Sequence, residues 1–203
     1  MERFKNFWYH YKFRTIFFAI LTVIIAVGIY SCATKEEYDM QILFYTSKNL
    51  PSSVSHSMEQ TIEDIFLKNG KELNVCVRDF SYDPYSKDGE GKTNNIAALS
   101  VEMKNKSSFI FISDKFRFEE ISNNKKQQGM FLKDNSVFDK YNNTAFSMSN
   151  TKFENDLIKK IEENGTTIAK MPEYYISVIN CDDKNNEEYK KALELIKMIK
   201  TEG

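Results

Sequence analysis

The stretch Ser86 to Thr93, SKDGEGKT, comes nearest in residue types and spacing to a known chemical motif. In a phosphate-binding loop, glycines let backbone N–H groups cradle phosphates while a lysine reaches the terminal ones. Lys92 follows Gly91 as that chemistry requires, but Ser86 replaces the first glycine and Pro84 lies in a long preceding loop. The sequence therefore favours a solvated, glycine-rich loop over a nucleotide site.

Carboxylates in the same loop also invite a calcium-binding interpretation, because Asp83, Asp88 and Glu90 lie close together. A calcium-binding loop places oxygen ligands at alternate positions before its glycine and a glutamate six residues after it. The sixth residue after Gly89 is Asn95. The spacing therefore does not fit, and no metal site is predicted.

Histidine is scarce: the chain contains only His10 and His56. Because His10 belongs to the N-terminal tail, two histidines cannot bind one metal in the rest of the chain. A serine hydrolase triad would have to use His56, which has no nucleophile-elbow sequence and is expected to be an exposed residue at a helix start. We therefore predict a protein that is not an enzyme, with no catalytic residues and no cofactor.

The three cysteines have different surroundings. Cys32 follows Ile29-Tyr30-Ser31, which resembles a bacterial lipoprotein box, and lipidation of Cys32 is one alternative for membrane anchoring. Cys76 and Cys181 lie in strand-like stretches. An oxidising exterior would allow these two to form a disulfide, and the alternative is two separately buried thiols.

A charge-free run, TIFFAILTVIIAVGIYS, covers residues 15–31 and predicts a transmembrane helix near the short end of the usual range. Aromatic residues just before it would form an interfacial belt that extends the apolar length. A cleaved signal peptide is an alternative, although Lys35 after Ala33 is atypical of a cleavage site. We predict a signal anchor that remains in the mature protein.

The charges on either side of this run predict its orientation. Four of the 28 basic and one of the 29 acidic side chains lie in residues 1–31, so the remainder has a net charge of about −4. Basic flanks stay in the cytoplasm. The expected organisation is a cytoplasmic tail at 1–14, the transmembrane helix at 15–31, a linker at 32–38 and an extracytoplasmic domain at 39–203, in a single-pass protein of the cell membrane. The acidic balance argues against binding nucleic acid.

Hydrophobic periodicity in residues 39–203 predicts alternating strands and helices. Strands are expected at 39–46, 73–80, 108–112 and 174–179, and helices at 57–67, 96–103, 116–123, 152–163 and 187–200, with irregular structure at 127–141. Asn69-Gly70 and Asn164-Gly165 are helix-stop signals. The leading β-α-β-α-β order predicts an α/β fold with a mainly parallel, doubly wound sheet.

Ligands of such sheets usually bind at the carboxyl ends of the strands. The first three strands end in polar residues that we predict to converge there as a ligand-binding face: Tyr45, Thr46, Ser47, Tyr82, Ser113 and Asp114, together with Ser81. The alternative for Asp114 is that it caps the following helix, because aspartate favours helix starts.

The segment Ala97 to Leu132 resembles part of the extracellular solute-binding proteins of ABC importers, on Phe109 to Asp114 and on Gly129-Met130-Phe131-Leu132. The chain is also similar to small membrane-anchored proteins of low-GC Gram-positive bacteria, on Tyr38 to Ile42. The resemblance implies one lobe of a solute-binding fold, a membrane-anchored, non-enzymatic binding domain and a small-solute ligand. The alternative is an accessory or assembly subunit that contacts a partner protein in a membrane complex.

Overall fold

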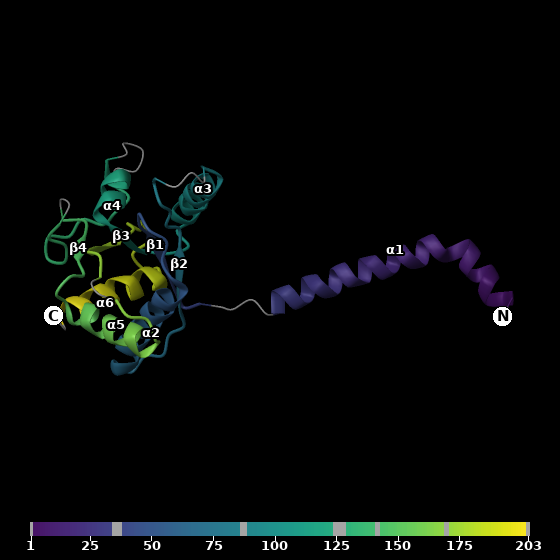
Figure 1. The fold of residues 1–203 in the computed structure, drawn as a ribbon, viewed down its shortest axis with the longest axis horizontal. Coiled ribbons are helices and arrows are strands. Elements are labelled where there is room, and N and C mark those ends of the chain that lie inside the picture. The colour runs from purple at the N-terminus through teal and green to yellow at the C-terminus, as the bar shows by residue number, and fades with distance from the viewer. Residues whose placement is uncertain are drawn as a thin grey trace. The chain divides into compact units, whose positions relative to one another are not determined.

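The structure is a computed structural model that describes residues 2–33, 38–85, 89–123, 129–140, 143–168 and 171–201. The chain divides into two compact units, Met1–Glu37 and Tyr38–Gly203. The first unit contains α1 (Glu2–Ala33). The second contains β1 (Met40–Tyr45), α2 (Ser52–Lys68), β2 (Val75–Asp79), α3 (Gly89–Asn105), β3 (Ile110–Asp114), α4 (Lys115–Ser122), β4 (Phe146–Ser147), α5 (Lys152–Glu163), β5 (Tyr174–Val178) and α6 (Glu187–Thr201) (Figure 1).

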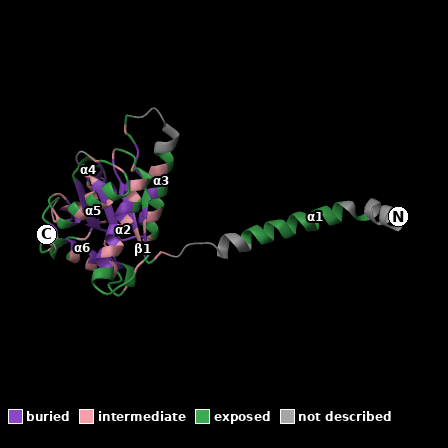
Figure 2. Cartoon of the chain, turned by 60° about the horizontal axis from the view of Figure 1, so that its bottom comes forward, coloured by how far each residue is buried: buried purple, intermediate pink, exposed green. Residues whose placement is uncertain are grey.

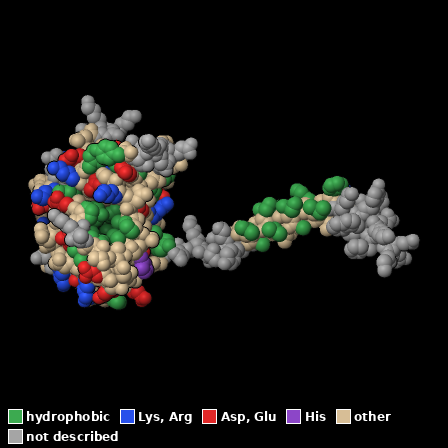
Figure 3. Space-filling view, in the orientation of Figure 1, with side chains coloured by type: hydrophobic (Ala, Val, Ile, Leu, Met, Phe, Trp, Pro, Cys, Tyr) green, Lys and Arg blue, Asp and Glu red, His purple; other side chains and the backbone are tan. Residues whose placement is uncertain are grey.

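α1 is one uninterrupted helix whose described side chains, Tyr11 and residues 13–28, are all exposed (Figure 2). Apolar side chains follow one another along it, with Phe17 63% and Val23 61% exposed, and several of them lie on the face seen in Figure 3. The hydroxyls of Thr15 and Thr22 donate to the carbonyls of Tyr11 and Phe18, so these polar groups are satisfied inside the helix. Within the described ranges, no helix combines the length and apolarity needed to cross a bilayer.

The second unit is an α/β fold whose five-stranded sheet has the order β2-β1-β3-β5-β4. β1 pairs in parallel with β2 and with β3, whereas β5 is antiparallel to both β3 and β4. The prediction of a mainly parallel sheet is therefore wrong, because two of the four pairings are antiparallel. The chain between α4 and β5 brings β5 into the sheet from the opposite end, and a hydrophobic pattern carries no information about strand direction.

The predicted strands and helices of the second unit are confirmed, with boundaries shifted by a few residues. α2 begins earlier than expected, so His56 lies inside the helix and not at its start. α2 and α5 end at the predicted signals, where Gly70 and Gly165 have φ of 74° and 80°. A left-handed residue after a helix suits glycine, which has no Cβ to clash. The short strand β4 was missed, since two residues give no periodicity.

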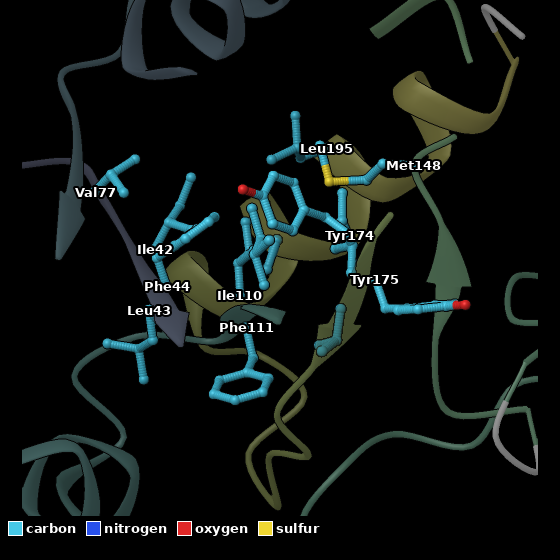
Figure 4. Packing of buried hydrophobic residues seen from close by; sticks show 14 of the residues in the cluster. Ile42, Leu43, Phe44, Val77, Ile110, Phe111, Met148, Tyr174, Tyr175 and Leu195 are labelled. Atoms are coloured by element: carbon cyan, nitrogen blue, oxygen red, sulfur yellow. The ribbon is translucent and has the colours of Figure 1, made fainter. Parts of the chain in front are cut away.

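Two helical layers cover the sheet, with α2, α5 and α6 on one face and α3 and α4 on the other (Figure 1). Alternation along β1 sends Ile42 toward the side of Leu195 of α6, whereas Leu43 and Phe111 point to the opposite side (Figure 4). All of these side chains are buried. Both sheet faces are therefore apolar, which explains the continuous apolar runs in β1 and β3.

Cys76 and Cys181 are not joined in a disulfide; the first is half-buried in β2 and the second is buried just after β5. Two strands, β1 and β3, separate β2 from β5 in the sheet. The disulfide considered from the sequence is therefore not formed. The side chain of Cys32 lies outside the described residues, so its lipidation stays a prediction.

Candidate functional site at the strand ends

The carboxyl ends of β1 and β3 lie next to each other, as predicted. Because the two strands are parallel and Tyr45 pairs with Ser113, the residues that follow them meet at one edge of the sheet. The backbone N–H of Ser47 donates to Oδ2 of Asp114 at 2.7 Å. The ends of β1 and β3 therefore meet at one edge of the sheet, and the ligand-binding role of Tyr45, Thr46, Ser47, Ser113 and Asp114 stays a prediction.

Asp114 uses its second carboxylate oxygen to cap α4. Its Oδ1 accepts from the backbone N–H of Arg117 at 2.8 Å, and its own backbone is extended, as at a helix N-cap. Both oxygens thus accept backbone N–H groups. The helix-capping interpretation of Asp114 is correct, and its carboxylate is engaged in holding β1, β3 and α4 together.

Thr46 and Ser81 fix the end of β2 to the end of β1. The hydroxyl of Ser81 accepts from the backbone N–H of Thr46 at 2.9 Å and lies 3.0 Å from the Thr46 hydroxyl. The hydroxyl of Thr46 also contacts the carbonyl of Lys48 at 2.6 Å. Thr46, Ser81 and Ser113 are all buried. Ser113 Oγ has no hydrogen-bond partner among the described residues.

Arg117, a residue that the sequence did not single out, lies at the centre of this edge. It is only 1% exposed. Its Nη1 donates to the Tyr82 hydroxyl and its Nη2 to the Tyr82 carbonyl, each at 2.7 Å. The guanidinium carbon lies 3.7 Å from the Tyr82 ring centroid and 5.1 Å from that of Tyr45. Stacking of the guanidinium on the two aromatic rings, and the hydrogen bonds from both of its Nη atoms, compensate the cost of burying this charge.

Glu120 completes the group, which we call the Arg117 cluster: Tyr45, Tyr82, Arg117 and Glu120. Oε2 of Glu120 accepts from Arg117 Nη1 at 2.7 Å and from the Tyr45 hydroxyl at 3.1 Å. Its side chain is 44% exposed. Burial, helped by the contact with Tyr82, raises the pKa of Tyr45. Burial lowers the pKa of Arg117, but the hydrogen bond to Glu120 and the electrostatic interactions with Tyr45, Tyr82 and Glu120 together outweigh it, so the net shift is upward.

A sequence signal for Arg117 exists, although it is weak. Asp114 ends β3 and caps α4 directly, so the third residue after it belongs to the first turn of a helix that starts at the sheet edge. Side chains of a helix point back toward its N-terminus. An arginine at that position is thereby aimed over the strand ends, where Tyr45 and Tyr82 follow β1 and β2.

The other chemical candidates lie apart from this cluster. The predicted glycine-rich loop is wrong from Gly89 onward, because Gly89 to Thr93 form the first residues of α3. Residues 86–88, and the side chain of Lys92, lie outside the described residues. His56 is an exposed residue of α2 that contacts Glu59 at 3.5 Å and Gln60 at 3.0 Å. Among the described residues, no group of three or more His, Cys, Asp or Glu side chains is placed to hold a metal ion.

Two surface hollows are lined by residues outside the strand-end network. One of about 140 Å³ lies between α2 and α5 and is bordered by Thr61, Asp64, Lys68, Asp156, Lys159, Lys160 and Glu163. The second, of about 600 Å³, lies where β2 begins and is bordered by Asp39, Glu63, Asp64, Leu67, Glu72, Leu73 and Asn74. Neither hollow coincides with the predicted ligand-binding face.

The fold and the site define an α/β protein with a mixed five-stranded sheet and a buried polar network at the carboxyl ends of β1 and β3. Comparison with models of protein families, with curated proteins and with solved structures found no match. The similarity to solute-binding proteins and to membrane-anchored proteins of low-GC Gram-positive bacteria therefore stays a prediction.

Proposed function

We propose that this chain is a membrane-anchored, non-enzymatic interaction domain that contacts a partner protein in a membrane complex. The observation that carries the proposal is the engagement of the strand-end side chains with one another. Both oxygens of Asp114 accept backbone N–H groups, and Thr46 bonds with Ser81. Since Thr46, Tyr82 and Ser113 are also buried, a solute would have to break this network. An outer surface that contacts a protein requires no such loss.

The proposed anchor is α1. Its described side chains from residue 13 to residue 28 are exposed, and between them only Arg14 is charged. α1 ends at Ala33, so it has nineteen charge-free residues from Thr15 onward. A helix of that length spans roughly 29 Å, close to the thickness of the hydrocarbon core. A helix that is apolar on every side needs such surroundings.

The basic flank at residues 3–14 supports a cytoplasmic N-terminus and an extracytoplasmic C-terminal domain. Acyl chains on Cys32 are the alternative anchor and would place the domain on the same side of the membrane.

Orientation is tested with two single-cysteine variants made after Cys32, Cys76 and Cys181 are replaced. Tyr85, which is 90% exposed, reports on the domain, and Tyr11, which is 46% exposed, reports on the tail. A membrane-impermeant maleimide applied to intact cells should label Tyr85→Cys, and should label Tyr11→Cys only after lysis. The reverse pattern, or both proteins in the soluble fraction, contradicts the proposal.

The interaction itself is tested by photo-cross-linking in cells, with a photoreactive amino acid at one exposed position of the full chain at a time. The domain offers exposed large apolar residues on three helices and one turn: Leu67 in α2, Val101 in α3, Phe116 in α4 and Tyr85 in the turn that precedes residue 86. A protein partner predicts one adduct of constant mass from neighbouring positions and none from the others. Equal adducts from every position, or none from any, would argue against a specific partner.

A second candidate function, binding of a small carboxylate solute, is supported by the Arg117 cluster. Two donors, Arg117 Nη1 and the Tyr45 hydroxyl, converge on one carboxylate oxygen of the half-exposed Glu120. An incoming carboxylate would take the place of that side chain. Calorimetry with acetate should then show binding to the Glu120→Ala variant, and the further change Arg117→Met should abolish that binding. If the Glu120→Ala variant also gives no heat of binding, this candidate function is ruled out.

A further inference from the structure

β2 is an edge strand of the sheet (Figure 1). The backbone N–H of Phe80 donates to the carbonyl of Phe44 in β1, at 2.8 Å. Since successive residues of a strand alternate sides, the N–H and C=O groups of Val75 and Val77 point away from β1 toward the outer edge of the sheet. Val75 and Val77 are only 3% and 9% exposed, so this edge is shielded, and it becomes a template for another strand only when the side chains that cover it move away.

Two carboxylates occupy this edge. Glu63 accepts from the backbone N–H of Val75 at 3.0 Å, and Glu59 accepts from that of Val77 at 2.8 Å. The match has a geometric cause, because four residues of a helix rise about 6 Å while two residues of a strand rise about 6.6 Å. The two glutamates of α2 thus take the place of the carbonyls of a neighbouring strand.

The hollow of about 600 Å³ continues this edge at the start of β2. It is bordered by Glu63 itself, by Asn74 just before β2, and by Leu67, which is 61% exposed. Asp39, Asp64 and Glu72 border it as well, and its lining includes no basic residue. Lysines contact two of the carboxylates from outside the lining, Lys191 at Asp39 and Lys160 at Asp64. Acidic and apolar side chains therefore lie together beside the outward-pointing backbone groups of β2.

We propose that the β2 edge accepts an extended, basic segment of a partner protein as an added strand. The inference rests on the proposed interaction function and names its mode. On docking, the N–H groups of Val75 and Val77 would release the carboxylates of Glu63 and Glu59 and donate instead to backbone carbonyls of the partner, as in other strand additions. Glu59 and Glu63 would then pair with lysine or arginine side chains of that segment, because unpaired carboxylates beside a sheet edge are costly.

The choice of occupant follows from charge. A neutral or acidic strand would leave the displaced carboxylates without a partner, and an anionic lipid surface would be repelled by the acidic groups along the hollow. The opposite edge of the sheet is less suited to pairing, since β4 has only two residues. β2 has five.

The test uses the full chain in detergent micelles and four fluorescent peptides: alternating Lys-Val, the same peptide with N-methyl groups on alternate residues, alternating Glu-Val, and a neutral alternating Ser-Val peptide that serves with the variants below. N-methylation removes backbone donors while it keeps the charge. The proposal predicts that the Lys-Val peptide binds about tenfold or more tightly than either control, by fluorescence anisotropy. Equal binding of the methylated peptide would show a purely electrostatic contact, and no saturation by about 1 mM would also overturn the proposal.

Matched variants locate the site. Glu59→Gln with Glu63→Gln keeps side-chain oxygens that accept the N–H groups but removes two charges, so the preference for Lys-Val over a neutral Ser-Val peptide should fall about tenfold. Glu187→Gln with Glu188→Gln removes the same charge from α6 and should leave the preference unchanged. Equal loss in both pairs contradicts docking at β2.

Hydrogen exchange adds a readout that charge alone would not move. In the charge-neutral Gln pair, saturating Lys-Val peptide should slow the exchange of the Val75 and Val77 amides relative to the same pair without peptide, because the carbonyls of an added strand hold these N–H groups more firmly than mobile side chains do. Dimerisation of the protein through β2 without peptide would assign the edge to a second copy and overturn the choice of a partner. A cross-linked partner at Phe116 but not at Leu67 would preserve the interaction function and reject this mode.

Discussion

The backbone N–H of Ser47 and the carboxylate of Asp114 are joined at 2.7 Å, although 67 positions separate them in the chain. The same carboxylate caps α4 through the N–H of Arg117. One side chain therefore ties the end of β1, the end of β3 and the start of a helix.

The first prediction concerns this tie. Asp114→Ala removes the acceptor of two backbone N–H groups, a helix cap and a charge-assisted bond, and should lower the free energy of unfolding by about 2 to 3 kcal/mol. Asp114→Asn retains one carbonyl oxygen and should lose about half as much. Urea unfolding followed by circular dichroism measures both. Asp83→Ala is the control, because Asp83 accepts from one N–H, that of Tyr85, in an exposed turn; an equal cost there would contradict the role of Asp114.

The second prediction concerns Arg117. Arg117→Met removes the guanidinium that donates to Glu120 and to both oxygens of Tyr82, and leaves Glu120 with the weaker hydrogen bond from the Tyr45 hydroxyl. It should cost about 3 to 5 kcal/mol, as removal of one partner from a buried charge network does. Arg117→Lys keeps the charge but neither the fork nor the stacking, and should fall between. The half-exposed Glu120 is the matched control: Glu120→Gln should cost about 1 kcal/mol or less. Equal losses at Arg117 and Glu120 would mean that burial of the arginine is unimportant.

The third prediction is a pH dependence at Tyr174. Burial, with smaller contributions from Asp114 and Asp79, raises its pKa to about 12. Because the pKa is raised in the folded protein, the unfolded chain releases the Tyr174 proton at a lower pH. The stabilisation of the folded protein by protonated Tyr174 is therefore complete below about pH 10 and is lost as the pH rises toward 12. The expected loss is about 2 to 3 kcal/mol.

Tyr174→Phe should therefore flatten the fall in unfolding free energy between pH 9 and about pH 11.5, measured by urea titration. Tyr85→Phe serves as control, because that side chain is 90% exposed. A fall of the same steepness in both variants would rule out Tyr174 as its source.

The fourth prediction tests the anchor. Ile24 lies in the charge-free run and is 62% exposed. Ile24→Asp should raise the cost of inserting α1 by about 3 kcal/mol and move protein from the carbonate-resistant membrane fraction to the extractable one. Ile24→Leu should change nothing. If both variants remain equally resistant to extraction, something other than α1 holds the protein on the membrane.

Much of the second unit was determined by the sequence itself, because periodicity and breakers act within one element. The positions of β1, β3, α5 and α6 follow from their apolar spacing, and the Asn-Gly pairs end α2 and α5 where expected. The meeting of Ser47 with Asp114 was also predictable, since the carboxyl ends of neighbouring parallel strands share one edge.

Only the tertiary structure decided what these residues contact. The direction of β5 depends on the path of the chain after α4, and no local pattern records that path. Arg117 became the centre of the site because α4 places it between Tyr45, the last residue of β1, and Tyr82, which follows β2. In the sequence, Glu59 and Glu63 look like solvated helix residues. They accept the backbone N–H groups of β2 only because α2 packs beside Val75 and Val77. Contacts between distant segments depend on how whole elements pack, and the sequence of a single element cannot specify them.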